Sequence, residues 1–192
     1  MIEVIVTSDM LQSAKGKAEE MGTLNNSITK GKGNLAGFVG EQIASNVMGG
    51  AWKNTYEYDL ITDKGIRVDV KTKQTTVQPR HYYECSVADY NTRQQCDVYA
   101  YVRVKNSFDC GWFLGYMPKD EYYERATHFN KGDFDPSNNY TFKASCYNLP
   151  INELKFLQLG MMYRLILHQK IIDQHPLFLN QKLMQLLEIY LL

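Results

Sequence analysis

Residues 52–73 predict a β-hairpin, and no other part of the sequence restricts the fold as strongly. Apolar residues alternate with charged ones after Gly65, as in a strand with one buried face. Just before that run, Thr62 leads into Asp63-Lys64-Gly65, where turn-forming residues are followed by a glycine suited to a left-handed backbone. A three-residue loop with Gly65 in that conformation would pair Thr62 with Ile66 and set the register of the whole hairpin.

This register would gather charged side chains on one face of the hairpin. Asp59 would lie opposite Asp69, and Glu57 opposite Lys71. Directly opposed side chains have Cβ atoms about 4.5–5.5 Å apart, so two carboxylates there need a positive charge nearby. Lys71 lies two residues beyond Asp69 on the same face, whereas a two-residue loop would put the two aspartates on opposite faces. The cluster therefore depends on the length of the turn.

Two carboxylates at this distance suit a hard cation such as Mg²⁺, or Mn²⁺ in its place. Such an ion takes oxygen ligands from one or two carboxylates and completes its shell with water and substrate phosphate. It favours deprotonation of an attacking water, and an ammonium such as that of Lys71 can orient the water or hold a phosphate oxygen. This is the chemistry of phosphodiester hydrolysis. Without a metal, Lys71 and Lys73 would instead neutralise the aspartates as a surface charge network.

The remaining segments predict a mixed α/β fold around the hairpin. Apolar residues recur every four positions from Leu35 to Val47, which indicates a helix that carries Glu41 and ends at Gly49-Gly50. After the hairpin, residues 82–87 either extend the sheet or precede a helix at about 86–95, ahead of a buried strand. The other expected elements are an N-terminal strand at 2–6 and helix at 8–21, strands at 98–104, 112–117 and 140–147, helices at 118–126 and from Pro150, and a helical tail from about Met161.

The order of these features resembles that of the PD-(D/E)XK nuclease superfamily. An acid-bearing helix is followed by a strand with an aspartate, by a strand with an acid-x-Lys pattern, and then by a helix and a buried strand. The resemblance covers about residues 33–105 and implies a restriction-endonuclease-like αβββαβ core with a mixed sheet. Tyr58 stands where the motif of the superfamily has proline.

The same resemblance implies roles for single residues. Asp59 and Asp69 look like the metal ligands, and Lys71 looks like the catalytic lysine. Glu41 is similar to the helical acid that binds the metal directly or through water, and the carbonyl of Val70 is similar to a further ligand. Because Glu41 lies beside the apolar stripe of its helix, a solvent-facing position fits it equally well.

The activity implied is that of a metal-dependent DNA endonuclease that leaves a 5′-phosphate. A Holliday-junction resolvase of the same fold is an alternative, since such enzymes share the acid-bearing helix and the Asp-x-Lys hairpin. A non-catalytic nucleic-acid-binding or assembly module would keep the fold and use the charged strand face for contacts. Gln94 and Gln95, near the end of the expected 86–95 helix, fit a solvated helix end better than a site.

Contacts with DNA would have to come from a local basic surface. The chain has 21 Lys and Arg against 21 Asp and Glu, so its formal net charge is zero. Candidates that could follow a phosphate backbone are Lys30, Lys32, Lys53, Arg67, Lys73 and Arg80. The glycines at 31, 33 and 37 are neither preceded by a strand nor followed by a Walker lysine, so no nucleotide cofactor is predicted.

The length of 192 residues favours one domain with a helical C-terminal extension at about 160–192. Apolar residues surround the helix expected at 176–192, which predicts packing on the body of the protein or on a second copy in a homodimer. Arg164 and Glu188 interrupt the longest apolar runs, and no signal-peptide pattern opens the chain, so we expect no membrane span. The four cysteines lack CxxC spacing and fit reduced thiols in the cytoplasm.

Overall fold

The computed structural model of the chain describes residues 1–21, 34–53, 55–136 and 139–156. They belong to one compact unit, Met1–Phe156. Lys30, Lys32 and the C-terminal extension with its expected homodimer helix lie outside the described residues.

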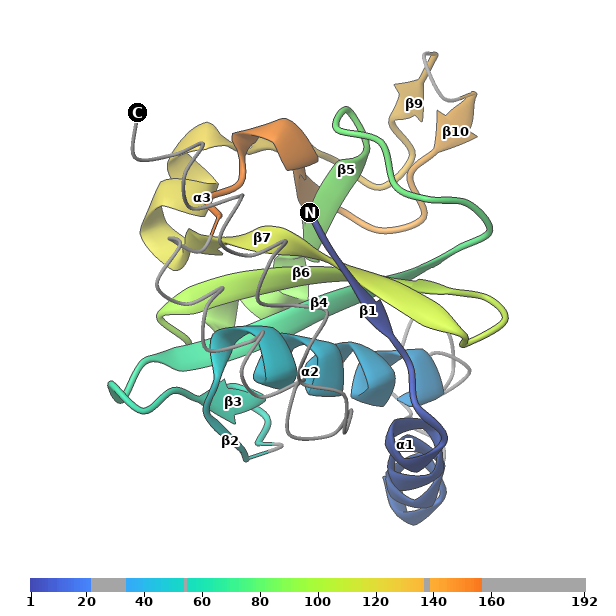
Figure 1. Cartoon of the computed structure of the whole chain (residues 1–192). Helices are drawn as coiled ribbons and strands as arrows, with labels where there is room; N and C mark the ends of the chain where they lie inside the picture. Colours follow the sequence, from blue (N-terminus) through green and yellow to red (C-terminus); the bar gives the residue numbers. More distant parts are fainter. Residues whose placement is uncertain (22–33, 54, 137–138, 157–192) are drawn as a thin grey trace, which may run out of the picture. The chain divides into compact units, whose positions relative to one another are not determined.

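A six-stranded mixed sheet forms the centre of this unit, in the order β1-β7-β6-β4-β3-β2 (Figure 1). Strands β4 and β6 run parallel, while the other neighbours are antiparallel. A parallel pair needs a crossover connection, and the chain between β4 and β6 contributes one strand to a second sheet before it returns. The strands of the large sheet are β1 (Ile2–Ile5), β2 (Ala51–Trp52), β3 (Leu60–Ile61), β4 (Arg67–Thr75), β6 (Val98–Lys105) and β7 (Cys110–Pro118). The predicted mixed α/β class is confirmed.

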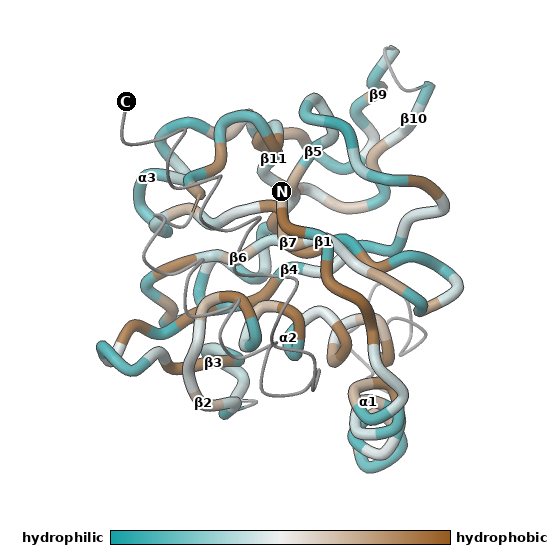
Figure 2. The backbone as a smooth tube through the Cα atoms, in the orientation of Figure 1, coloured by the Kyte–Doolittle hydropathy of each residue, from teal (hydrophilic) through white to brown (hydrophobic). Residues whose placement is uncertain are grey.

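Helix α2 (Asn34–Met48) covers one face of the large sheet, and α1 (Ser8–Met21) packs against α2. The predicted apolar stripe of α2 is buried, with Val39 and Ile43 fully enclosed. In Figure 2, α1 is largely hydrophilic, as expected of a helix that contacts the unit along one side. Helix α2 comes so close to β4 at Gly40 that a Cβ there would overlap the side chain of Thr72. This close approach holds the following residue, Glu41, against the sheet.

A second, three-stranded sheet covers the opposite face. It has the order β5-β11-β8 and consists of β5 (Glu84–Ala88), β8 (Thr127–Phe129) and β11 (Cys146–Pro150), with α3 (Lys119–Arg125) beside it. The core between the layers includes Tyr99, Tyr101 and Tyr122, all almost completely buried. The hydroxyl of Tyr122 donates to the carbonyl of Tyr147 at 2.7 Å and so joins α3 to β11. The remaining short elements are β9 (Phe134–Asp135), β10 (Tyr140–Thr141) and 3₁₀ helices at Asp89–Arg93 and Ile151–Glu153.

In the crossover between β4 and β6, the strand expected within residues 82–87 forms as β5, in the second sheet, whereas the helix alternative is wrong. The helix expected at 86–95 is absent from this described segment: strand β5 is followed only by the 3₁₀ turn Asp89–Arg93. Cys85 and Val87 point into the core at alternate positions and β5 pairs with β11, which lies far along the chain. Similarly, the strand expected at 140–147 is split into β10 and β11, and the helix expected from Pro150 is a single 3₁₀ turn. In the crossover, pairing of β5 with the distant strand β11 overrode the local pattern.

Candidate active site

The predicted turn and register of the hairpin are confirmed. Leu60 lies opposite Val68, and the amide of Thr62 donates to the carbonyl of Ile66 at 2.9 Å. Gly65 has a φ of 78°, in the left-handed region that favours glycine. The turn therefore has the length on which the acidic cluster depends.

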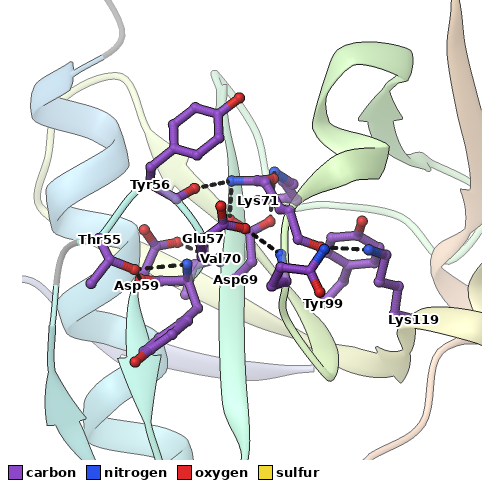
Figure 3. Close-up of polar contacts among 12 residues, drawn as sticks. Thr55, Tyr56, Glu57, Asp59, Asp69, Val70, Lys71, Tyr99 and Lys119 are labelled. Carbon is purple, nitrogen blue, oxygen red and sulfur yellow. Dashed lines mark hydrogen bonds and ion pairs between the residues drawn. The ribbon is translucent and has the colours of Figure 1, made fainter.

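Asp59 enters the cluster differently from the prediction. Its amide donates to the carbonyl of Val68 at 2.9 Å, one residue off the register of the hairpin. Its carboxylate turns to the edge of β4 and accepts a hydrogen bond of 2.7 Å from the amide of Val70 (Figure 3). The expected cross-strand opposition of Asp59 and Asp69 is thus replaced by a contact at the strand edge. Both carboxylates still lie beside Val70.

Asp69 and Lys71 form a buried ion pair on the face of β4 that looks toward the second sheet. Their Oδ2 and Nζ atoms are 2.5 Å apart, and their side chains are only 4% and 15% exposed. Gln94 bonds to both: its Oε1 accepts from the ammonium of Lys71 at 2.9 Å, and its amide donates to Oδ1 of Asp69 at 3.2 Å (Figure 3). The prediction of a solvated Gln94 is wrong, because folding of the crossover brings it onto the hairpin.

Two loops meet beside this ion pair. The amide nitrogen of the Gln94 side chain also donates to the carbonyl of Tyr56 at 2.9 Å. Glu57, expected opposite Lys71, instead accepts a hydrogen bond of 2.6 Å from the backbone amide of Gln95. These bonds connect the β2–β3 loop to the segment just before β6 and hold Gln94 beside Asp69 and Lys71.

Glu41 points into the protein from α2 and is 8% exposed. The solvent-facing alternative is therefore wrong. The indole Nε1 of Trp52 donates to its Oε2, and the ammonium of Lys17 lies 3.0 Å from the centre of the Trp52 ring. Burial, with a smaller contribution from the charge of Asp69, raises the pKa of Glu41 to about 7 against the opposing effects of Trp52 and Lys17.

The acidic groups of the site repel one another. Burial raises the pKa of Asp59 well above its usual range, and the charges of Asp69 and Glu41 add to the increase. The amide of Val70 and the ammonium of Lys71 act in the opposite direction without cancelling it. These acids therefore stay protonated more readily than free carboxyls, and ionising them beside Asp69 would give the site more negative charge than Lys71 neutralises, which favours a bound cation.

The donor set fits a hard divalent ion. Within residues 1–156, as far as they are described, no three acidic, histidine or cysteine side chains converge closely enough to make a complete metal site. Mg²⁺ needs only one or two carboxylates, with carbonyl oxygens and water for the rest. Asp59 and Asp69 supply two carboxylates, and the Val70 carbonyl lies on the same strand edge as the amide bound by Asp59. Oδ2 of Asp69 is buried and has only the ammonium of Lys71 beside it in the described chain.

The basic residues proposed for DNA contacts have different surroundings. Arg67 is engaged by Asp97, with Nε 3.0 Å from Oδ2. Lys53 and Arg80 are exposed, in the β2–β3 loop and in the loop before β5. Lys73 reaches Ser86 on β5, at 2.6 Å from Nζ to Oγ. Arg67 and Lys73 both lie on the same face of β4 as Asp69 and Lys71, but Arg67 is held by Asp97.

Compared with models of protein families and with curated proteins, the sequence matches none. No helix in the described part of the chain is both long and apolar enough to cross a membrane. The four cysteines are free thiols, and burial raises the pKa of Cys85 to about 12 and that of Cys96 to about 11. Neither thiol is a candidate nucleophile, because the thiolate is the reactive form.

Proposed function

We propose that this protein is a Mg²⁺-dependent DNA endonuclease, with Mn²⁺ able to replace Mg²⁺. One observation carries the proposal: Asp59, Asp69 and Lys71 meet around Val70 at the edge of β4, with Glu41 buried behind them. A structural salt bridge between Asp69 and Lys71 does not by itself account for two further carboxyls with raised pKa values, those of the buried Glu41 and the half-buried Asp59.

The topology supports the same proposal. Helix α2 is followed by β2, β3 and β4 as an antiparallel meander, and the chain then crosses over to β6, parallel to β4. This order is compatible with the αβββαβ core that the resemblance implied, except that the second sheet and a 3₁₀ turn stand in place of the crossover helix.

The side chains would divide the work of hydrolysis as follows. Asp59, Asp69 and the carbonyl of Val70 would hold the ion, with Glu41 as a direct or water-linked ligand. A bound Mg²⁺ supplies Lewis-acid polarisation of the phosphate and lowers the pKa of a ligated water. Lys71, held by Asp69 and Gln94, would orient that water or hold a phosphate oxygen.

The test is cleavage of plasmid, single-stranded and four-way-junction DNA with and without Mg²⁺. We expect Asp69→Asn and Lys71→Ala each to reduce the Mg²⁺-dependent rate by about 100-fold or more. The control variants Asp109→Asn and Lys105→Ala break an exposed ion pair of 2.7 Å at the β6–β7 turn and should keep full activity.

Cleavage of four-way junctions alone would identify a resolvase, and DNA binding without cleavage would favour the non-catalytic module. Cleavage that survives both Asp69→Asn and Lys71→Ala would refute the site.

A further inference from the structure

A cavity of about 270 Å³ lies next to the candidate site, between the large sheet and β5. We call it the basic cavity, because its lining includes three cations, those of Lys71, Lys73 and Arg103. Residues two apart on a strand share a face, so Asp69, Lys71 and Lys73 form one row along β4. In the parallel register, Arg103 on β6 is the neighbour of Lys73. The basic cavity therefore continues the site, with Lys71 common to both.

Within the described residues, the two cations farther from the site are not held in a close ion pair, although the charge of Glu84 acts on Lys73. Nζ of Lys73 donates to the hydroxyl of Ser86 at 2.6 Å. Arg103 donates to the carbonyl of Glu84 at 2.9 Å and stacks 5.6 Å from the ring centre of Tyr83. In the part of the chain that the structure describes, neither takes part in an ion pair. Burial lowers the pKa of both groups, and the charge of Arg103 lowers that of Lys73 further.

Two further groups complete the lining. Tyr101, which is 1% exposed, lines the cavity with its ring 5.7 Å from that of Tyr122. The carboxyl of Glu84 also faces the cavity; one of its oxygens is buried without a hydrogen-bond partner in the described part of the chain, and burial raises its pKa. Because Lys71 is paired with Asp69, the charges that remain are those of Lys73 and Arg103 against the single carboxyl of Glu84, so the cavity is positive even with Glu84 ionised. Uncompensated cations with hydroxyl donors favour a tetrahedral oxyanion.

We propose that the basic cavity binds a phosphate group of the nucleic-acid strand that the site cleaves, next to the phosphate undergoing attack. The identity of the strand rests on the proposed function, whereas the affinity for phosphate rests on the cavity alone. Lys71 would contact the reacting phosphate, while Lys73, Arg103 and Ser86 would hold its neighbour. These contacts position the strand without reading its bases.

Binding is measured in EDTA, so that it does not depend on cleavage. The probe is a fluorescein-labelled single-stranded oligonucleotide, followed by fluorescence anisotropy from about 50 to 200 mM KCl. We expect Lys73→Met to weaken binding and to reduce the slope of log K against log[salt] by about 1, since one phosphate contact is lost. Lys73→Arg should restore binding, and Glu84→Gln should strengthen it by removing a like charge. Lys64→Met, at the exposed tip of the hairpin, is the matched control.

Competition by inorganic phosphate, and a comparison of probes with and without a 5′-phosphate, distinguish a free phosphate, a strand end and an internal phosphodiester as the group that the cavity binds. Inorganic phosphate should displace the probe from the wild type more effectively than chloride of equal ionic strength, and this advantage should be lost in Lys73→Met. Equal affinity for 5′-phosphorylated and 5′-hydroxyl probes would assign the cavity to an internal phosphodiester, and a preference for the former to a strand end.

Unchanged affinity and salt slope in Lys73→Met, with unfolding like that of the wild type, would overturn the proposal even if the protein cleaves DNA. Lys73-dependent binding of phosphate and DNA in a protein that never cleaves would support the basic cavity and reject the proposed nuclease.

Discussion

Replacing Glu41 by glutamine should stabilise the metal-free protein at high pH. An acid whose pKa is raised in the folded state is ionised at a cost, so the folded protein loses stability as the pH rises from the unfolded to the folded pKa. For Glu41 these values are 4.5 and about 7. Glutamine carries no charge at any pH, and its carbonyl oxygen can still accept the hydrogen bond from Trp52.

The size of the effect follows from these two values. At 1.36 kcal/mol for each unit of pKa, Glu41→Gln should add up to about 3 kcal/mol to the free energy of unfolding at pH 8. At pH 5 the folded protein holds Glu41 protonated, and the gain should fall below about 1 kcal/mol. The gain should therefore appear between pH 5 and pH 7 and level off above that range.

Urea unfolding followed by circular dichroism, in EDTA at several pH values from 5 to 8, measures this difference. Glu19→Gln, at an exposed position of α1, is the matched control and should change stability by less than about 0.5 kcal/mol at any pH. A Glu41→Gln protein no more stable than the wild type at pH 8 would refute the reasoning. Glu41 would then be a structural carboxylate compensated by Trp52 and Lys17.

Further predictions concern metal binding, packing and assembly. Mg²⁺ should raise the melting temperature more at pH 8 than at pH 6, because the ion binds ionised carboxylates, and Asp59→Asn should remove most of this shift; equal shifts at both pH values would contradict the site. Gly40→Ala should lower the free energy of unfolding by about 1–3 kcal/mol, because a Cβ there would lie 2.9 Å from Cβ of Thr72. Gly37→Ala, with no atom within 4 Å of its added Cβ, should be neutral or stabilising by up to about 1 kcal/mol; equal losses from both would contradict the packing argument. If the segment from Pro176 forms a homodimer, a chain cut before Pro176 should be monomeric by size exclusion with light scattering, whereas the full-length chain should be dimeric. The same oligomeric state for the cut and the full-length chain would refute the dimer.

Local patterns in the sequence were sufficient for the hairpin and for the helix that faces it. Gly65 and the residues before it define a three-residue turn, and the turn sets the register of β3 and β4. The apolar repeat of α2 identified its buried side. These features depend on residues within a few positions of one another, so the sequence could predict them without knowledge of distant contacts.

Distant contacts decided the details of the site. Gln94 joins Asp69 and Lys71 only because the crossover folds as strand β5 and a 3₁₀ turn, which depends on pairing with β11. A glutamine in a loop carries no sequence signal that it will bond to Asp69 and Lys71. Trp52, by contrast, lies four positions after the end of α2, so its indole could have been predicted as a hydrogen-bond donor to Glu41.

The sequence by itself determined which acidic and basic side chains share the hairpin, because strand alternation and turn length are local properties. Only the tertiary structure turned Asp59 onto the amide of Val70, enclosed Glu41, and set Arg103 beside Lys73. Burial, and with it the raised pKa of Glu41 and the uncompensated charge of the basic cavity, arises from layers that are far apart in sequence. A periodic pattern can therefore indicate where these charges lie on a strand, while the electrostatic forces between them depend on what the rest of the chain places around them.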